Sequence, residues 1–145
     1  MLTLLNDRIY QVTVEKVENV KVGEQSRTIV TGWAVDKMRQ TALPLAVAGT
    51  GMTVSRNTRV DLEKTYGLDP SDQAGFTIVI PQGVQNFDLM CQAPGTTMTR
   101  HINVQRLMSR FRMQYISTRV HRLMFYAAHL GNREAMKDLR DAVRR

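Results

Sequence analysis

Four residues in the first half of the chain have the side-chain types that saccharide-binding sites use. They are Trp33, Arg56, Arg59 and Asp61. An indole ring offers an apolar face, while guanidinium and carboxylate groups donate and accept hydrogen bonds. The same residues also suit a structural role, because Trp33 alternates inward on a predicted strand and an Arg/Asp turn can hydrogen-bond its neighbours. We favour the structural role and keep ligand binding as the alternative.

The other reactive side chains form no recognisable catalytic or metal-binding motif. His101, His121 and His129 do not have the spacing of metal ligands. Cys91 is the only cysteine, which excludes an intramolecular disulfide, and no base stands beside it in the sequence. The segment 49–51 (Gly-Thr-Gly) lacks the further glycine and the lysine of phosphate-binding loops. We therefore expect no catalytic residue, no bound metal and no cofactor.

The positive charge of the chain lies at its C-terminal end. Residues 1–105 carry ten basic and ten acidic side chains, whereas residues 106–145 carry ten basic and three acidic ones and hold the whole net charge of +7. This division predicts a sandwich domain over residues 1–105 and a basic helical tail, a linker or docking segment, over residues 106–145.

Apolar and polar residues alternate along the first region as they do in β-strands. About seven strands are predicted, over residues 4–22, 28–35, 43–48, 52–55, 76–80, 87–92 and 98–104. The glycine-containing loop at 49–51 predicts a hairpin between the third and fourth of them. Residues 59–66 are expected to form one or two helical turns that end at Gly67. The fold class is mainly β, an antiparallel β-sandwich.

From Val104 onward the apolar spacing becomes that of an amphipathic helix, and two or three basic helices are predicted. Arginines flank the apolar face, which suits an anionic membrane surface, packing on the sandwich, or another protein. The candidates for membrane or partner contact are Arg110, Arg112, Arg119 and Arg122. Binding of nucleic acid is less favoured, because the tail lacks the motifs of known nucleic-acid modules.

A series of short motifs occupies residues 32–80. They are Gly-Trp-Ala (32–34), Val-Ser-Arg-Asn (54–57), Arg-x-Asp-Leu (59–62), Tyr66 and Ala-Gly-Phe-Thr-Ile-Val-Ile (74–80). Their order resembles the accessory β-sandwich domain that precedes family-2 glycosyltransferase catalytic domains in Gram-positive bacteria that make surface polysaccharides. The resemblance covers about residues 8–145, and Leu62 departs from the valine of the family pattern.

The resemblance implies a non-catalytic module that positions the enzyme, its acceptor or a partner. The partner would be a downstream glycosyltransferase domain or another protein, because 145 residues cannot hold both the sandwich and the catalytic domain. One alternative is a stand-alone carbohydrate- or protein-binding sandwich, and another is a small nucleic-acid-binding protein that uses the basic helices. The N-terminus does not resemble a signal peptide, so we expect a cytoplasmic protein, at the inner face of the membrane if the tail binds lipid.

Overall fold

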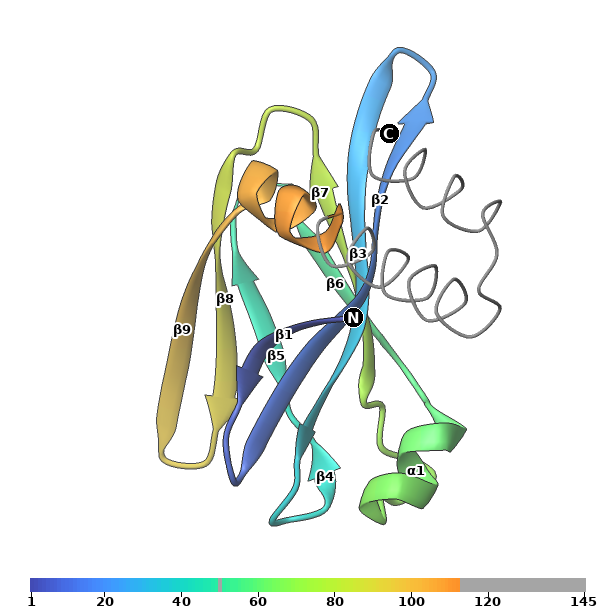
Figure 1. Ribbon diagram of the computed structural model, residues 1–145, viewed down its shortest axis with the longest axis vertical. Helices are drawn as coiled ribbons and strands as arrows, with labels where there is room; N and C mark the ends of the chain where they lie inside the picture. Colours follow the sequence, from blue (N-terminus) through green and yellow to red (C-terminus); the bar gives the residue numbers. More distant parts are fainter. Residues whose placement is uncertain (50, 113–145) are drawn as a thin grey trace, which may run out of the picture.

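The computed structural model describes residues 1–49 and 51–112, and Figure 1 shows them as two packed β-sheets with two helices. The first six strands are β1 (Leu2–Asn6), β2 (Tyr10–Val22), β3 (Gln25–Asp36), β4 (Thr41–Ala42), β5 (Leu45–Ala48) and β6 (Thr53–Asn57). They are followed by α1 (Val60–Tyr66), β7 (Gly75–Pro81), β8 (Asn86–Ala93) and β9 (Thr96–Asn103). A second helix occupies residues 104–112. The predicted antiparallel sandwich is confirmed.

The larger sheet has the strand order β1-β2-β3-β7-β6, and β4 pairs with the end of β3. The smaller sheet has the order β5-β8-β9. Every strand pair is antiparallel. The central strand β3 therefore pairs with its neighbour in sequence, β2, on one side and with the distant strand β7 on the other.

The predicted hairpin between residues 43–48 and 52–55 is wrong. The two strands form, but β5 pairs with β8 in the smaller sheet and β6 pairs with β7 in the larger one. The connection at residues 49–52 thus carries the chain from one sheet to the other. Alternation identifies strands and their buried faces, but it does not identify their partners, which long-range packing selects.

The described residues contain nine strands rather than about seven. Residues 2–22 form two strands because a turn at Asp7 separates them. The Asp7 carboxylate accepts hydrogen bonds from the backbone N–H groups of Ile9, at 2.8 Å, and Tyr10, at 2.7 Å. Asp side chains favour turns through such local bonds. The second additional strand is β4, in which Thr41 and Ala42 pair with Asp36 and Val35 at the end of β3. It directly precedes the strand that was predicted to begin at residue 43.

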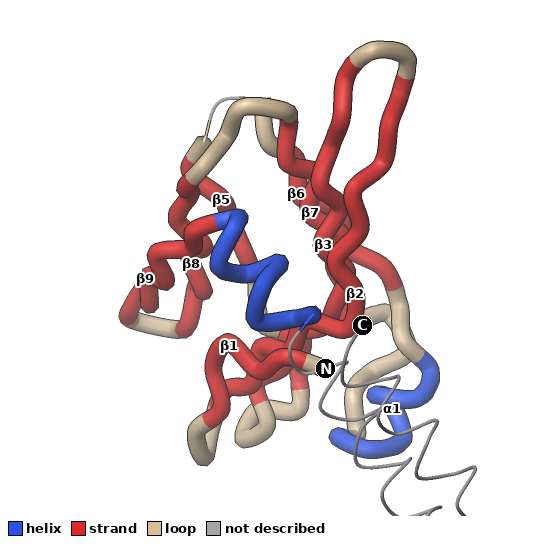
Figure 2. The backbone as a smooth tube through the Cα atoms, turned by 45° about the horizontal axis from the view of Figure 1, so that its top comes forward, coloured by secondary structure: helices blue, strands red, loops and turns tan. Residues whose placement is uncertain are grey.

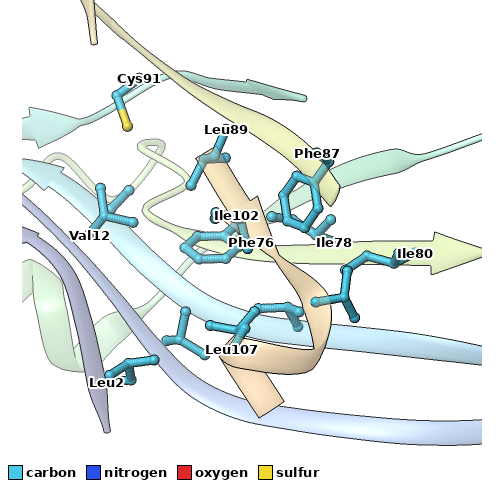
Figure 3. Close-up of a cluster of buried hydrophobic side chains, with 14 of the residues drawn as sticks. Leu2, Val12, Phe76, Ile78, Ile80, Phe87, Leu89, Cys91, Ile102 and Leu107 are labelled. Carbon is cyan, nitrogen blue, oxygen red and sulfur yellow. The ribbon is translucent and has the colours of Figure 1, made fainter. Parts of the chain in front are cut away.

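The main core lies between the two sheets. Phe76, Ile78 and Ile80 alternate along β7 and are almost fully buried, and Leu89 of β8 faces them across the sandwich (Figure 3). Leu107 of the second helix packs into the same cluster. In Figure 2 this helix runs from the end of β9 toward the larger sheet, alongside β1. The first part of the predicted basic tail is therefore part of the sandwich core.

The second helix begins where the sequence provides a cap. The side-chain oxygen of Asn103 accepts a hydrogen bond from the backbone N–H of Arg106 at 2.9 Å, as an N-cap residue does. Val104 and Leu107 are buried, and Met108 and Phe111 are partly buried against the core, which is the spacing of one helix face. The further helices predicted for the tail, together with Arg119 and Arg122, lie outside the described residues.

A second, smaller core lies on the outer face of the larger sheet. It contains Trp33 and Val35 of β3, Leu62 of α1, and Leu68 and Ala74 of the connection to β7. The helix α1 covers these strand residues, and Gly67 ends it in the left-handed conformation as predicted. Both faces of the end of β3 are consequently buried, because Ala34 faces the main core while Trp33 faces α1.

Candidate functional site

The four residues predicted as a possible sugar site lie around α1 and the end of β6, where three of them make polar contacts within the protein. Arg56 extends from β6 and donates to three backbone carbonyl oxygens. Its Nη1 bonds to Leu43 at 2.7 Å, its Nε to Gly75 at 3.1 Å, and its Nη2 to Ala74 at 3.3 Å. Burial lowers the pKa of the Arg56 guanidinium from its usual value. Arg56 therefore fastens the connection after β4 to the start of β7.

Arg59 lies between two carboxylates. Its Nε and Nη2 bond to Asp61 at 3.0 and 2.8 Å, and its other contacts are with Glu15 of β2, one of them an Nη2–Oε2 bond of 3.2 Å. The hydrogen bonds to Glu15 and Asp61 raise the pKa of Arg59, and the same bond from Arg59 lowers that of Asp61. The sequence predicted a tether to backbone groups here; the tether is ionic and joins the start of α1 to β2.

Glu15 lies at a shift in strand register. The pairing of β2 with β3 shifts between Val14 and Lys16, so that Glu15 is an extra residue on β2. Such a bulge changes which side chains face the core. Val14 is buried in the main core before the shift, and Val17 packs against that core after it. Alternation places Glu15 on the same face of β2 as Gln11, which bonds to Tyr66 of α1, but it does not identify Arg59 as the partner of Glu15.

Trp33 is covered by its neighbours. Only 7% of the surface of Trp33 is exposed. The centroid of its ring lies 5.7 Å from that of the Tyr66 ring, and the two ring planes are inclined at 44°. The Tyr66 hydroxyl donates a hydrogen bond to Oε1 of Gln11 at 3.2 Å. A buried indole cannot serve as an open stacking platform for a sugar ring, so its contacts are those of a core residue.

Three other arginines lie close together on a different part of the surface, without the hydrogen bonds to protein oxygens that Arg56 and Arg59 make. A cavity of about 220 Å³ lies between β1, β9 and the second helix. We call it the basic groove; it is lined by Thr3 and Leu4 of β1, residues 100–103 of β9, and Arg106, Leu107 and Arg110 of the second helix. It contains Arg110, one of the arginines predicted to contact a membrane or a partner, whereas Arg112 is exposed and is not part of the lining.

Two elements aim the three arginines of the basic groove at one space. Arg106 and Arg110 are four residues apart, so they share a face of the helix. Arg100 is two residues before the buried Ile102 on β9, so both side chains lie on the same side of that strand. The buried Leu107 and Ile102 and the half-buried Leu4 form the apolar part of the lining.

A second hollow adjoins the basic groove. It has a volume of about 560 Å³ and shares His101, Ile102, Asn103 and Arg106 with the groove. Here the ring nitrogen Nδ1 of His101 contacts a carboxylate oxygen of Asp88 on β8, and Asn103 donates to Asn86 at 3.0 Å. The hollow therefore contains a carboxylate that already has a basic partner.

The sequence did not single out Arg100 or Arg106. The available signal was the i, i+4 spacing of Arg106 and Arg110 on an amphipathic helix, which indicates a shared basic face. Arg100 stands in the neutral part of the chain, on the strand that leads directly into the second helix, so the charge division of the sequence did not group it with the other two.

Neither metal ligation nor membrane crossing is indicated by the described residues. Within residues 1–49 and 51–112, no three His, Cys, Asp or Glu side chains gather as a possible metal site. In the same part of the chain, no helix is long and apolar enough to cross a membrane. Comparisons of the chain with protein-family models, with curated proteins and with solved structures found no match.

Proposed function

We propose that this chain is a non-catalytic accessory module of a cytoplasmic bacterial glycosyltransferase of surface polysaccharide synthesis. In this role it positions the enzyme, its acceptor or an assembly partner. The proposal starts from the resemblance of the motifs in residues 32–80 to accessory β-sandwich domains that precede family-2 catalytic domains.

One observation carries the proposal: the motif residues work together to build the frame of a domain. Trp33 of Gly-Trp-Ala packs beside Tyr66 with the rings tilted, and Leu62 of Arg-x-Asp-Leu packs in the same small core. Arg59 and Asp61 of that motif pair with each other and reach β2 through Glu15. A set of motifs that holds a helix on a sheet is expected of a positioning domain.

The test has two arms. The first is to read the encoding frame on both sides of this chain; we expect a family-2 catalytic domain with an Asp-x-Asp segment in the same protein. The second compares the complete encoded protein with a version that lacks residues 1–145, using a panel of nucleotide sugars. We expect both to turn over the donor and the deletion to lose acceptor use or assembly.

Two results would count against the proposal. One is turnover of a nucleotide sugar by residues 1–145 in isolation, since the module would then be an enzyme. The other is an encoding frame that stops directly after Arg145 with no glycosyltransferase domain encoded on either side.

A further inference from the structure

The described residues contain nine arginines, which differ in what they contact and in whether they line a common space. Arg56 and Arg59 bond to carbonyl and carboxylate oxygens of the protein. The side chains of Arg100, Arg106 and Arg110 make no hydrogen bond or ion pair within residues 1–49 and 51–112, although all three line the basic groove. We propose that the basic groove binds the phosphate group of an anionic ligand, a site that does not depend on the proposed function.

The chemistry of the lining matches a phosphate group. Guanidinium groups present several N–H donors in one plane and bind phosphate oxygens in pairs, with shorter and stronger bonds than neutral donors make. Arg106 and Arg110 approach the groove from the helix, and Arg100 approaches it from β9. Hence donors from two elements converge on the same space.

The charge of the groove lining also favours binding of an anion. None of the described residues that line it is an aspartate or a glutamate. Three like charges around one partly apolar cavity repel one another, and a bound anion relieves this repulsion. In the adjoining hollow, by contrast, Asp88 contacts His101. Asp88 is not part of the groove lining, and its ionic partner among the described residues is His101 rather than an arginine of the groove.

The size of the groove restricts the ligand. A volume of about 220 Å³ is smaller than the ~300–1,000 Å³ of pockets that enclose drug-sized ligands. A phosphate or diphosphate group is therefore the part that enters, and any larger group attached to it remains outside. Two sources supply such a group: a small phosphate-bearing molecule and the headgroup of an anionic lipid.

The experiment titrates the full chain with inorganic pyrophosphate by isothermal calorimetry at low and moderate salt. The double variant Arg106→Gln/Arg110→Gln removes two groove charges, and the double variant Arg8→Gln/Arg39→Gln removes two exposed charges elsewhere. We expect the first to weaken pyrophosphate binding at least about tenfold, the size of effect that loss of paired charged hydrogen bonds gives, and the second to change it less than about twofold.

Single substitutions separate the geometry from the charge. Arg106→Lys keeps the charge but loses the planar donor pair, so its affinity should fall between those of the wild type and Arg106→Gln. Circular dichroism and thermal melts of each variant establish that it is folded. Because Arg106 and Arg110 are exposed, we expect both substitutions to leave the fold intact.

Vesicles distinguish the two sources. Co-sedimentation is measured with vesicles of phosphatidylcholine alone and with phosphatidylglycerol added. Groove-dependent binding to the anionic vesicles that pyrophosphate displaces identifies a lipid headgroup, whereas binding of pyrophosphate without vesicle binding identifies a small molecule. Either result supports the site. If neither probe binds, or if both double variants lose affinity equally, the proposal is overturned.

Discussion

Replacing Gly32 by alanine should separate strands that the sandwich needs in contact. Gly32 lies on β3 between Val14 and Phe76, its partners on the two neighbouring strands. An added Cβ would stand 2.0 Å from the backbone oxygen of Thr13 and 2.9 Å from Cζ of Phe76. The phenyl ring can shift, but the carbonyl can only move with β2. The Gly of the Gly-Trp-Ala motif is thus required by the close approach of two strands.

The expected cost follows from these two obstacles. Overpacking a core costs typically about 1–3 kcal/mol, occasionally more. Because one of the obstacles is backbone, we expect Gly32→Ala to lower the free energy of unfolding by about 3 kcal/mol or more, which corresponds to a fall in Tm of about 10 °C for a domain of this size. Urea denaturation followed by the fluorescence of Trp33, the only tryptophan, measures it.

Gly83→Ala is the matched control. Gly83 has a φ of +90°, and a Cβ there would have nothing within 4 Å. Its cost is that of placing a side chain in the left-handed region, about 1–2 kcal/mol. Gly32→Ala should therefore be the more damaging change. A loss at Gly32 below about 1 kcal/mol, or smaller than that at Gly83, would refute the reasoning from close approach.

Three further predictions concern stability and reactivity. Leu107→Ala should cost about 2–5 kcal/mol in urea denaturation because the side chain is buried in the main core, while the exposed Ser109→Ala should change stability by less than about 0.5 kcal/mol; equal effects would contradict the packing of the second helix. Arg59 lowers the pKa of Asp61, so the wild type should lose stability as the pH falls from about 4 through that lowered pKa, and Asp61→Asn should lose less over the same range in acid titrations of Tm. Burial raises the pKa of the Cys91 thiol, so a disulfide reagent should modify it slowly in the native protein at pH 8 and rapidly in urea; fast native modification would show that the site is open.

Local pattern was sufficient to predict most elements of the fold. Phe76, Ile78 and Ile80 alternate with less buried residues, and they share one buried face of β7 as expected. The helical turns before Gly67 were also predictable, because the spacing of Leu62 and Tyr66 and the terminal glycine are signals within a few residues of one another.

Features that depend on distant parts of the chain were not predictable. The partner of β5 is β8 rather than the adjacent β6, and no residue near the connection encodes that choice. The contact of Arg59 with Glu15 joins positions 44 apart in sequence. The basic groove also depends on distant positions, because Thr3 and Leu4 of β1 line it together with Arg100, Arg106 and Arg110.

The crossing of the chain between sheets has a consequence for how the domain folds. The strand β5 lies in sequence between β3 and β7, which are hydrogen-bonded to each other in the larger sheet, while β5 itself belongs to the smaller one. When β3 pairs with β7 in the larger sheet, the intervening chain that contains β5 must leave that sheet, and β5 then pairs with β8 in the smaller one. Long-range pairing of this kind slows folding, and it links the two sheets in a single cooperative transition rather than two independent ones. A cut between β7 and β8 would keep all strands of the larger sheet on one fragment, but it would also keep β5 there, apart from its partners β8 and β9 in the smaller sheet.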